Sequence, residues 1–167
     1  MLNIVLFEPE IPENTGNIAR MCVGLNATLH LIRPYGFFLN NKALLRSGVD
    51  YWKHLKLHEY DSFDLFLKNI KSKSQLFYLT RYGTKSPEQV KFSNKLDAYL
   101  IFGKESIGLP KELLKQNVAN TIRIPASKNI RSLNLANCVA ILGYEYMKQN
   151  GYVGLELEEP HKPLFKK

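Results

Sequence analysis

The sequence has few of the residues that build disulfides and metal sites. Only two of its 167 residues are cysteines, Cys22 and Cys138, and both lie in apolar, helix-like stretches. We interpret them as reduced, buried side chains, because free cysteine behaves as a small hydrophobe. The four histidines show no ligand spacing, and His54 and His58, four residues apart, lack the acid of an HExxH motif. The sequence therefore predicts no metal.

Long apolar runs are absent as well. No stretch approaches the ~20 apolar residues that a membrane-spanning helix needs. Residues 1–8 lack a basic leader and carry an acid at Glu8, which is unlike a signal peptide. We therefore expect a cytoplasmic protein without membrane association. The length suits one domain, predicted over residues 1–155, followed by a flexible polar tail over residues 156–167.

Acidic residues are in deficit. The chain has 15 acidic and 23 basic residues, a net charge of +8 and a pI of about 9.4. Such a charge attracts polyanions, of which nucleic acid is the commonest in the cytosol. Charge alone does not establish a nucleic-acid partner, since many basic proteins are merely soluble.

Short apolar runs alternate with segments of helical periodicity. Strands are expected at residues 3–7, 28–32, 55–57, 76–80, 99–102 and 121–124, and helices at 14–25, 62–70, 111–116 and 135–150. Strands with nearly continuous apolar residues are buried on both faces, which is typical of a parallel sheet flanked by helices. The predicted fold class is α/β, doubly wound, with strands and helices in alternation.

Ligands of such sheets bind at the carboxyl ends of the strands, where three loops are unusual. In the first, Pro9 and Pro12 precede a helix that we expect to open with Asn14, and Arg20 follows within that helix. Free amides at a helix N-terminus, together with an arginine, bind phosphate or carboxylate. The alternative is that Asn14 is only a helix cap and Arg20 a solvated charge.

The second loop contains Gly103, Glu105 and Gly108. Gly103 ends an apolar run, where a missing side chain lets a flat ligand approach the backbone. The spacing is not that of a GxGxxG dinucleotide loop, which argues against a Rossmann dehydrogenase or a kinase.

The third loop, residues 125–134, is polar and basic and enters the last helix through Ser132 and Asn134. Both could be plain helix caps. A serine nucleophile is not indicated, because no histidine lies nearby and no G-x-S-x-G elbow is present. Chemistry without a nucleophile, metal or catalytic histidine suggests transfer of a group from a positioned, activated cofactor.

Together the three loops resemble the SpoU branch of the SPOUT RNA methyltransferases. The matching motifs are N-x-G-N-x-x-R over residues 14–20, F-G-x-E-x-x-G-L-P over 102–110, and I-R-I-P…R-S-L-N-L-A-N over 122–137. The similarity also includes residues 4–12 and 45–51 and extends to about residue 152. It is greatest to the small single-domain members that methylate the wobble ribose of tRNA.

The resemblance implies a SPOUT fold with a C-terminal deep trefoil knot and a homodimer. It implies S-adenosyl-L-methionine as methyl donor, S-adenosyl-L-homocysteine as product, and the 2′-hydroxyl of nucleotide 34 of tRNA, a cytidine or modified uridine, as acceptor. The residues carried over are the donor-binding Leu79, Gly103, Ile124, Ser132 and Leu133, the catalytic Arg20, Asn14, Glu105, Asn134 and Ser132, and the substrate-binding Arg20, Arg131 and Tyr144.

The resemblance implies that Arg20 reaches the donor site of the partner subunit. Arg20 is also the family's candidate for activating the acceptor hydroxyl. A guanidinium stays protonated and has no lone pair, so we expect it instead to stabilise the developing alkoxide or orient a phosphate. Tyr144 has an alternative interpretation as a buried core residue. The chain departs from the family at Lys104, Ile107 and Leu133, where Pro, Arg and Met are frequent.

Two alternatives keep this fold. One is a 2′-O-methyltransferase of another RNA such as ribosomal RNA, whose larger members usually carry an added RNA-binding domain. The other is a non-catalytic RNA-binding protein, against which the intact Asn14, Arg20, Glu105 and Asn134 argue.

Overall fold

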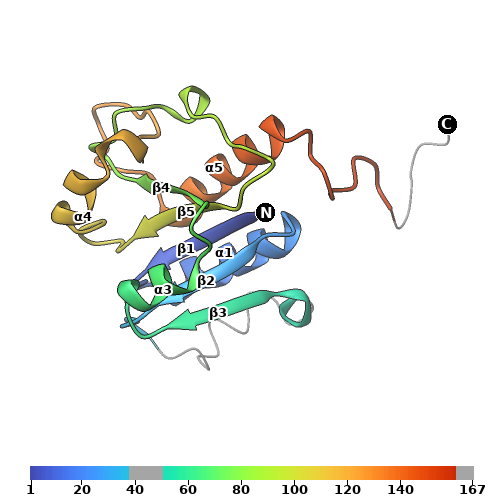
Figure 1. Cartoon of the computed structure of the whole chain (residues 1–167), viewed down its shortest axis with the longest axis horizontal. Helices are drawn as coiled ribbons and strands as arrows, with labels where there is room; N and C mark the ends of the chain where they lie inside the picture. The colour runs from blue at the N-terminus through green and yellow to red at the C-terminus, as the bar shows by residue number, and fades with distance from the viewer. Residues whose placement is uncertain (38–50, 161–167) are drawn as a thin grey trace.

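The computed structural model describes residues 1–37 and 51–160, and its centre is a six-stranded sheet (Figure 1). All neighbouring strands pair in parallel, in the order β3-β2-β1-β5-β4-β6. The strands are β1 (Leu2–Phe7), β2 (Thr28–Ile32), β3 (Lys56–Tyr60), β4 (Gln75–Leu79), β5 (Ala98–Gly103) and β6 (Thr121–Ile122). The predicted α/β class with a parallel sheet is confirmed. Of the family-like segment 45–51, residues 45–50 lie outside the described residues.

Four α-helices are described, each close to a predicted one. They are α1 (Pro12–Gly24), α3 (Phe63–Asn69), α4 (Lys111–Gln116) and α5 (Leu135–Gln149). Ser62 caps α3 as expected, accepting a hydrogen bond from the backbone N–H of Leu65 at 3.2 Å. The helix α4 follows Pro110 directly, as the sequence predicts.

The two faces of the sheet have separate apolar cores. On β1, Ile4 and Leu6 pack with side chains of α1 and α5, while Val5 packs on the other side with Phe66 of α3. This separation follows from the period of two along a strand, and every residue of β1 is buried. The central strands are therefore covered on both faces, as their continuous apolar sequence indicates.

Three expectations need correction at the edges of the sheet. The strand expected at 55–57 is longer, because β3 is an edge strand and tolerates exposed polar residues such as Lys56 and Glu59. The strand expected at 121–124 has only two residues, Thr121–Ile122. The expected alternation of strands and helices is interrupted between β4 and β5, which among described residues are joined through one 3₁₀ helix, Pro87–Gln89.

The carboxyl ends of β4 and β6 are joined by the turn that follows β4. Thr80 donates its backbone N–H to Ile122 at 2.9 Å, and Arg123 donates to Lys85 at 2.8 Å. A Cβ at Gly83 would lie 2.3 Å from the Ile122 carbonyl carbon, so only glycine lets the turn approach this closely. The trefoil knot stays a prediction.

The chain after α5 leaves the body of the molecule only beyond Leu155, which still packs against the apolar core. The residues that follow extend away from the sheet (Figure 1). The predicted tail begins within this stretch, at residue 156, and its residues 161–167 lie outside the described ones. In the described part of the chain, no helix is long and apolar enough to cross a membrane.

Candidate functional site

The helix α1 begins two residues earlier than predicted. Its first residue is Pro12 and its N-cap position is Ile11, so Asn14 is not the cap. Proline suits the first helical position, because its missing N–H would have no partner there. Asn14 instead lies inside the first turn with its side chain buried, at 6% exposure. The buried amide is thereby available to bond to other parts of the chain.

Glu105 supplies the acceptors at this helix start. One of its carboxylate oxygens accepts from the backbone N–H of Glu10 at 2.9 Å, and the other from the N–H of Ile11 at 3.3 Å and from Asn14 Nδ2 at 3.2 Å. The carboxylate thus satisfies backbone donors that would otherwise lack a partner at a helix N-terminus. The loop after β5 is fixed to α1 by these bonds.

Asn134 extends the same chain of bonds to the last helix. Its Nδ2 donates to Asn14 Oδ1 at 3.0 Å, while its Oδ1 accepts from the backbone N–H of Ala136 at 2.8 Å. The predicted cap at Asn134 is therefore confirmed. We call Glu105, Asn14 and Asn134 the amide–carboxylate network. It joins the three loops singled out by sequence, across as many as 120 residues of chain.

A second set of bonds encloses this network. Glu10 accepts from the backbone N–H and the hydroxyl of Ser106, each at 2.8 Å, and these bonds hold the pKa of Glu10 below its usual value. Arg131 donates to the Ser106 carbonyl at 2.8 Å, which brings the third loop onto the second. Glu10 and Ser106 were not predicted, because they carry no motif of their own.

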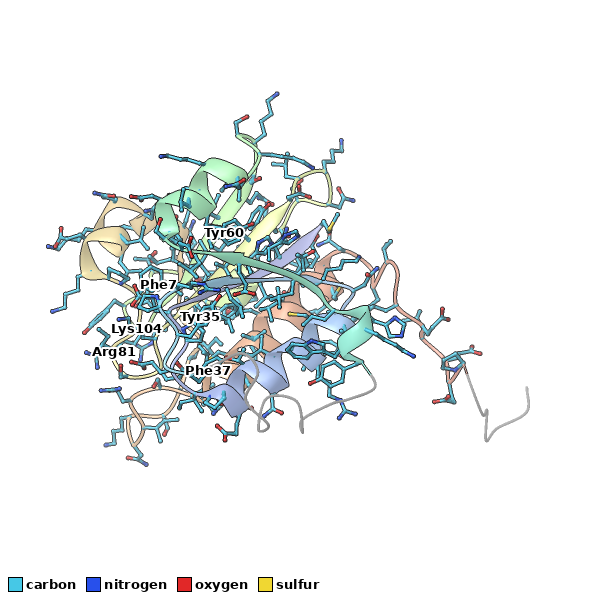
Figure 2. All side chains as sticks on the ribbon, turned by 90° about the horizontal axis from the view of Figure 1, so that it is seen from below. Phe7, Tyr35, Phe37, Tyr60, Arg81 and Lys104 are labelled. Atoms are coloured by element: carbon cyan, nitrogen blue, oxygen red, sulfur yellow. The ribbon has the colours of Figure 1, made fainter. Side chains whose placement is uncertain are left out.

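Lys104 lies beside the network and forms an ion pair. β1 and β5 end in register at Phe7 and Gly103, so the residues that follow them, Glu8 and Lys104, are neighbours. Lys104 Nζ lies 2.5 Å from Glu8 Oε2, and this contact raises the pKa of Lys104. Figure 2 labels Lys104 at this edge of the sheet. Lys104, at a position where proline is frequent in the family, thus has an ion-pair partner in the same chain.

The expected donor-binding residues lie on strand ends and in the third loop. Leu79, Ile124 and Leu133 are partly buried against the same apolar core. Gly103 ends β5, and a Cβ there would lie 2.5 Å from Leu109 Cδ2, so close packing by itself calls for glycine at this position. Ser132 is exposed.

Arg20 and Tyr144 lie outside the amide–carboxylate network. Arg20 is exposed on α1, with its guanidinium carbon 5.8 Å from the ring centroid of Tyr51. Tyr144 is 50% exposed on α5, so its alternative interpretation as a core residue is wrong. The buried tyrosine of that helix is Tyr146.

Cavities of the described part of the chain include two that lie at other positions. One, of about 320 Å³, lies between the turn after β4 and α4, and the other, of about 600 Å³, lies along β4. Neither is lined by Gly103, Ser132 or Leu133. The described residues contain no group of three or more histidine, cysteine or acidic side chains placed to hold a metal.

Both cysteines are buried and free, as predicted. Burial raises the pKa of the Cys22 thiol well above its usual range and that of Cys138 to about 11. Neither thiol is therefore prepared to act as a nucleophile.

Comparison with known proteins agrees with this arrangement. The model of the SpoU rRNA Methylase family matches residues 1–144. A Mycoplasma genitalium protein with the provisional name tRNA (cytidine(34)-2′-O)-methyltransferase is 47% identical over 158 residues, which are 93% of this chain and 95% of that protein.

Two solved structures extend the comparison. One, described as giving insight into 2-OH methylation of C/U34 on tRNA, has a TM-score of 0.85 and 42% identity, covering 91% of this chain and 97% of that one. A SpoU methyltransferase of Streptomyces viridochromogenes, solved with AdoMet, has the same fold at 20% identity, with a TM-score of 0.77 and coverages of 93% and 59%.

Proposed function

The chain belongs to the SpoU rRNA Methylase family, and we propose that it transfers a methyl group from S-adenosylmethionine to the ribose 2′-hydroxyl of nucleotide 34 of tRNA. The acceptor is a cytidine or a modified uridine, and the enzyme works as a cytoplasmic homodimer. The relatives that carry this activity in their names align with nearly the whole chain, so the proposal concerns the complete described domain.

The amide–carboxylate network is the observation that carries the proposal. It fixes, at one edge of a parallel sheet, the three loops in which a SpoU enzyme binds its donor and acceptor. Asn14 is bonded both to Glu105 and to Asn134, which indicates that the three side chains position the loops. A non-catalytic RNA-binding protein would have no need to hold these loops so firmly.

The third loop fits the expected donor. Within residues 125–133, the only backbone–backbone hydrogen bond joins Ile130 to Ser127, at 3.5 Å, so most backbone groups there are open to a ligand. Partly buried Leu79, Ile124 and Leu133 offer apolar contacts for the donor's adenosine and methionine portions. S-adenosylmethionine supplies an electrophilic methyl on a sulfonium sulfur, so the protein needs no nucleophile of its own.

The remaining task of the protein is to align the acceptor hydroxyl. As its oxygen bonds to the methyl carbon, the carbon–sulfur bond breaks and the hydroxyl proton leaves. Arg20 stabilises the negative charge that develops on this oxygen or orients the neighbouring phosphate, and the proton passes to phosphate or water. Arg131, held against Ser106, and exposed Tyr144 lie on the RNA side of the site.

Arg20 performs this role at the donor site of the partner subunit. It lies six residues beyond Asn14, which places it about 9 Å further along the helix and roughly 120° around it. It therefore points away from the network of its own subunit. Exposed Ile141 on the adjacent helix α5 gives this surface an apolar contact for a second copy.

Transfer of labelled methyl from S-adenosylmethionine to tRNA lacking this modification tests the reaction. We expect label in tRNA and, after nucleoside mapping, a 2′-O-methyl mark at nucleotide 34. Label in ribosomal RNA and none in tRNA would leave the chemistry intact and overturn the substrate. Donor binding without transfer to either RNA would support the binding-protein alternative.

Co-expression of two inactive variants tests the shared site. Arg20→Ala and Glu105→Gln, with different affinity tags, are purified together as mixed dimers. One of the two sites then combines the intact Arg20 of one subunit with the intact loops of the other, so about half of wild-type activity returns. An inactive mixed dimer would place Arg20 in the site of its own subunit, and failure to recover any mixed dimer would exclude the homodimer.

A further inference from the structure

The cavity beside α4 has the features of a nucleotide-binding site. It holds about 320 Å³ between the turn after β4 and the segment 111–121, and its walls include Leu114 and Val118. Tyr82 lines it and is 58% exposed even though the Arg81 guanidinium lies over its ring, so part of the ring remains open to a ligand. A flat apolar ring could therefore enter and stack on Tyr82.

Tyr82 is held in place by its neighbour. The guanidinium carbon of Arg81 lies 4.6 Å from the ring centroid, and Arg81 also donates a hydrogen bond to the Tyr82 hydroxyl. Arg123 in turn donates to the Arg81 carbonyl. The ring is therefore oriented before any ligand arrives, which lowers the entropic cost of stacking.

The charge around the cavity favours an anion. Residues 80–85 and 111–123 carry five basic side chains and one acidic one. Lys111 and Lys115 both line the cavity, and Lys115 pairs with the single acid, Glu112, at 2.7 Å. Lys111 has no ion pair among the described residues, so its charge is available to a phosphate.

The position of the cavity connects it to the site of methyl transfer. Thr80 and Thr121 line it, directly after Leu79 of β4 and at the start of β6. Figure 2 labels Arg81 and Lys104 at the same edge of the sheet, which is also the edge of the amide–carboxylate network. The cavity does not include Gly103, Ser132 or Leu133, so it is separate from the residues expected to hold the donor.

We propose that this cavity binds a further nucleotide of the substrate RNA, with its base stacked on Tyr82 and its phosphate on Lys111. The inference rests on the proposed function and adds a point of RNA contact beyond those proposed for Arg20, Arg131 and Tyr144. Stacking accepts any base, so the site adds affinity and alignment while leaving sequence preference to other contacts.

Binding of a labelled anticodon stem-loop RNA, measured by fluorescence anisotropy, tests the assignment. Tyr82→Ala raises the Kd about tenfold, the size expected for one lost stacked base, while Tyr82→Phe stays within about twofold. Lys111→Ala weakens binding and lowers the slope of log K against log salt by about one, as expected for one phosphate contact. Lys68→Ala, which removes the same charge from exposed α3, leaves the slope unchanged.

Two further measurements separate failure of the cavity assignment from failure of the proposed function. The Kd of S-adenosylhomocysteine, measured by calorimetry, stays at the wild-type value in Tyr82→Ala, whereas weaker binding would assign the cavity to the donor. Methyl transfer to tRNA by the wild type, with an unchanged RNA Kd in Tyr82→Ala, overturns only this inference. Absence of both stem-loop binding and methyl transfer in the wild type overturns the proposed function together with it.

Discussion

Two polar networks connect distant parts of this chain, and they differ in what they hold. In the middle of the sheet, His30 on β2 bonds to Asn3 on β1 and Tyr60 on β3, each at 3.1 Å. At the carboxyl edge, Asn14 bonds both to Glu105 and to Asn134. The first network joins neighbouring strands that the sheet already holds together, whereas the second joins loops. Hydrogen bonding alone thus does not mark a functional site.

The surroundings of the two networks differ accordingly. His30 is 5% exposed and lies among aromatic rings, including His58 at 5.3 Å and Tyr99 at 5.5 Å between centroids. Asn134 and the loop before it are exposed, so the second network borders a surface that ligands can reach. We therefore expect changes in the first network to affect stability and changes in the second to affect activity.

The largest effect on activity is expected from Glu105→Gln. The new NH₂ group faces N–H donors that now bond to carboxylate oxygen, so the loops lose their alignment while the apolar cores stay intact. A misplacement of about 1 Å costs roughly a hundredfold in rate, and we expect a loss of that size in kcat. Steady-state kinetics and a melting curve measure the two quantities separately.

Asp64→Asn is the matched control for this change, because it removes one carboxylate from exposed α3. Its activity should equal that of the wild type. If Glu105→Gln kept near-normal kcat, the network would be no more than a structural link between loops.

The His30 network is expected to affect stability in a pH-dependent way. Burial, and the neighbouring His58, lower the pKa of His30 from 6.5 to about 4. Between these values the unfolded chain binds more protons than the folded one, so stability rises with pH. The contribution of neutral His30 is complete above pH 6.5, is lost as the pH falls towards 4, and amounts to about 3 kcal/mol.

Chemical denaturation of the wild type and His30→Gln across this pH range measures the effect. The difference in unfolding free energy should be largest near pH 7 and shrink towards pH 4.5. Exposed His54→Gln should follow the wild type at every pH. The kcat of folded His30→Gln should be unchanged at neutral pH, and a large loss of kcat there would remove the distinction between the two networks.

The difference between local signals and long-range contacts explains which parts of the fold and of the site could be predicted from the sequence. Strands such as β1 and β5 and the capped helices α3 and α5 were predicted because their signals are local: apolar runs, and cap residues beside a helix. The start of α1 was misplaced, although Pro12 at the first helical position was an available signal.

Long-range contacts gave no such signal. Motif resemblance indicated that Glu105, Asn14 and Asn134 belong to one site, but not that they bond to one another, because 91 and 120 residues separate the partners. The pairing of Glu10 with Ser106 and the cavity at Tyr82 likewise depend on how distant turns meet. A single sequence carries no periodic or spacing pattern for such contacts.

The smallest effect on stability is expected at Asn134, which belongs to the amide–carboxylate network and also caps α5. Changes at this residue therefore test most closely whether the network affects activity rather than stability. Asn134→Asp keeps an oxygen for the Ala136 N–H but loses the donor to Asn14 Oδ1. Aspartate is as good a cap as asparagine, so the stability should change little. The contact with Asn14 Oδ1 changes from a hydrogen bond worth ~1.5 kcal/mol to a repulsion between two oxygens, so kcat should fall about tenfold. Asn134→Ala removes both functions and should add about 1 kcal/mol of destabilisation.

Comparing the two Asn134 variants by melting and by kinetics separates the cap from the network. Equal activity losses with unequal stabilities mean that the bond to Asn14 positions the third loop and that the cap only supports the helix. If instead Asn134→Asp were fully active, the exposed end of the network would be dispensable. The positioning role would then rest on the three bonds that Glu105 accepts from the start of α1.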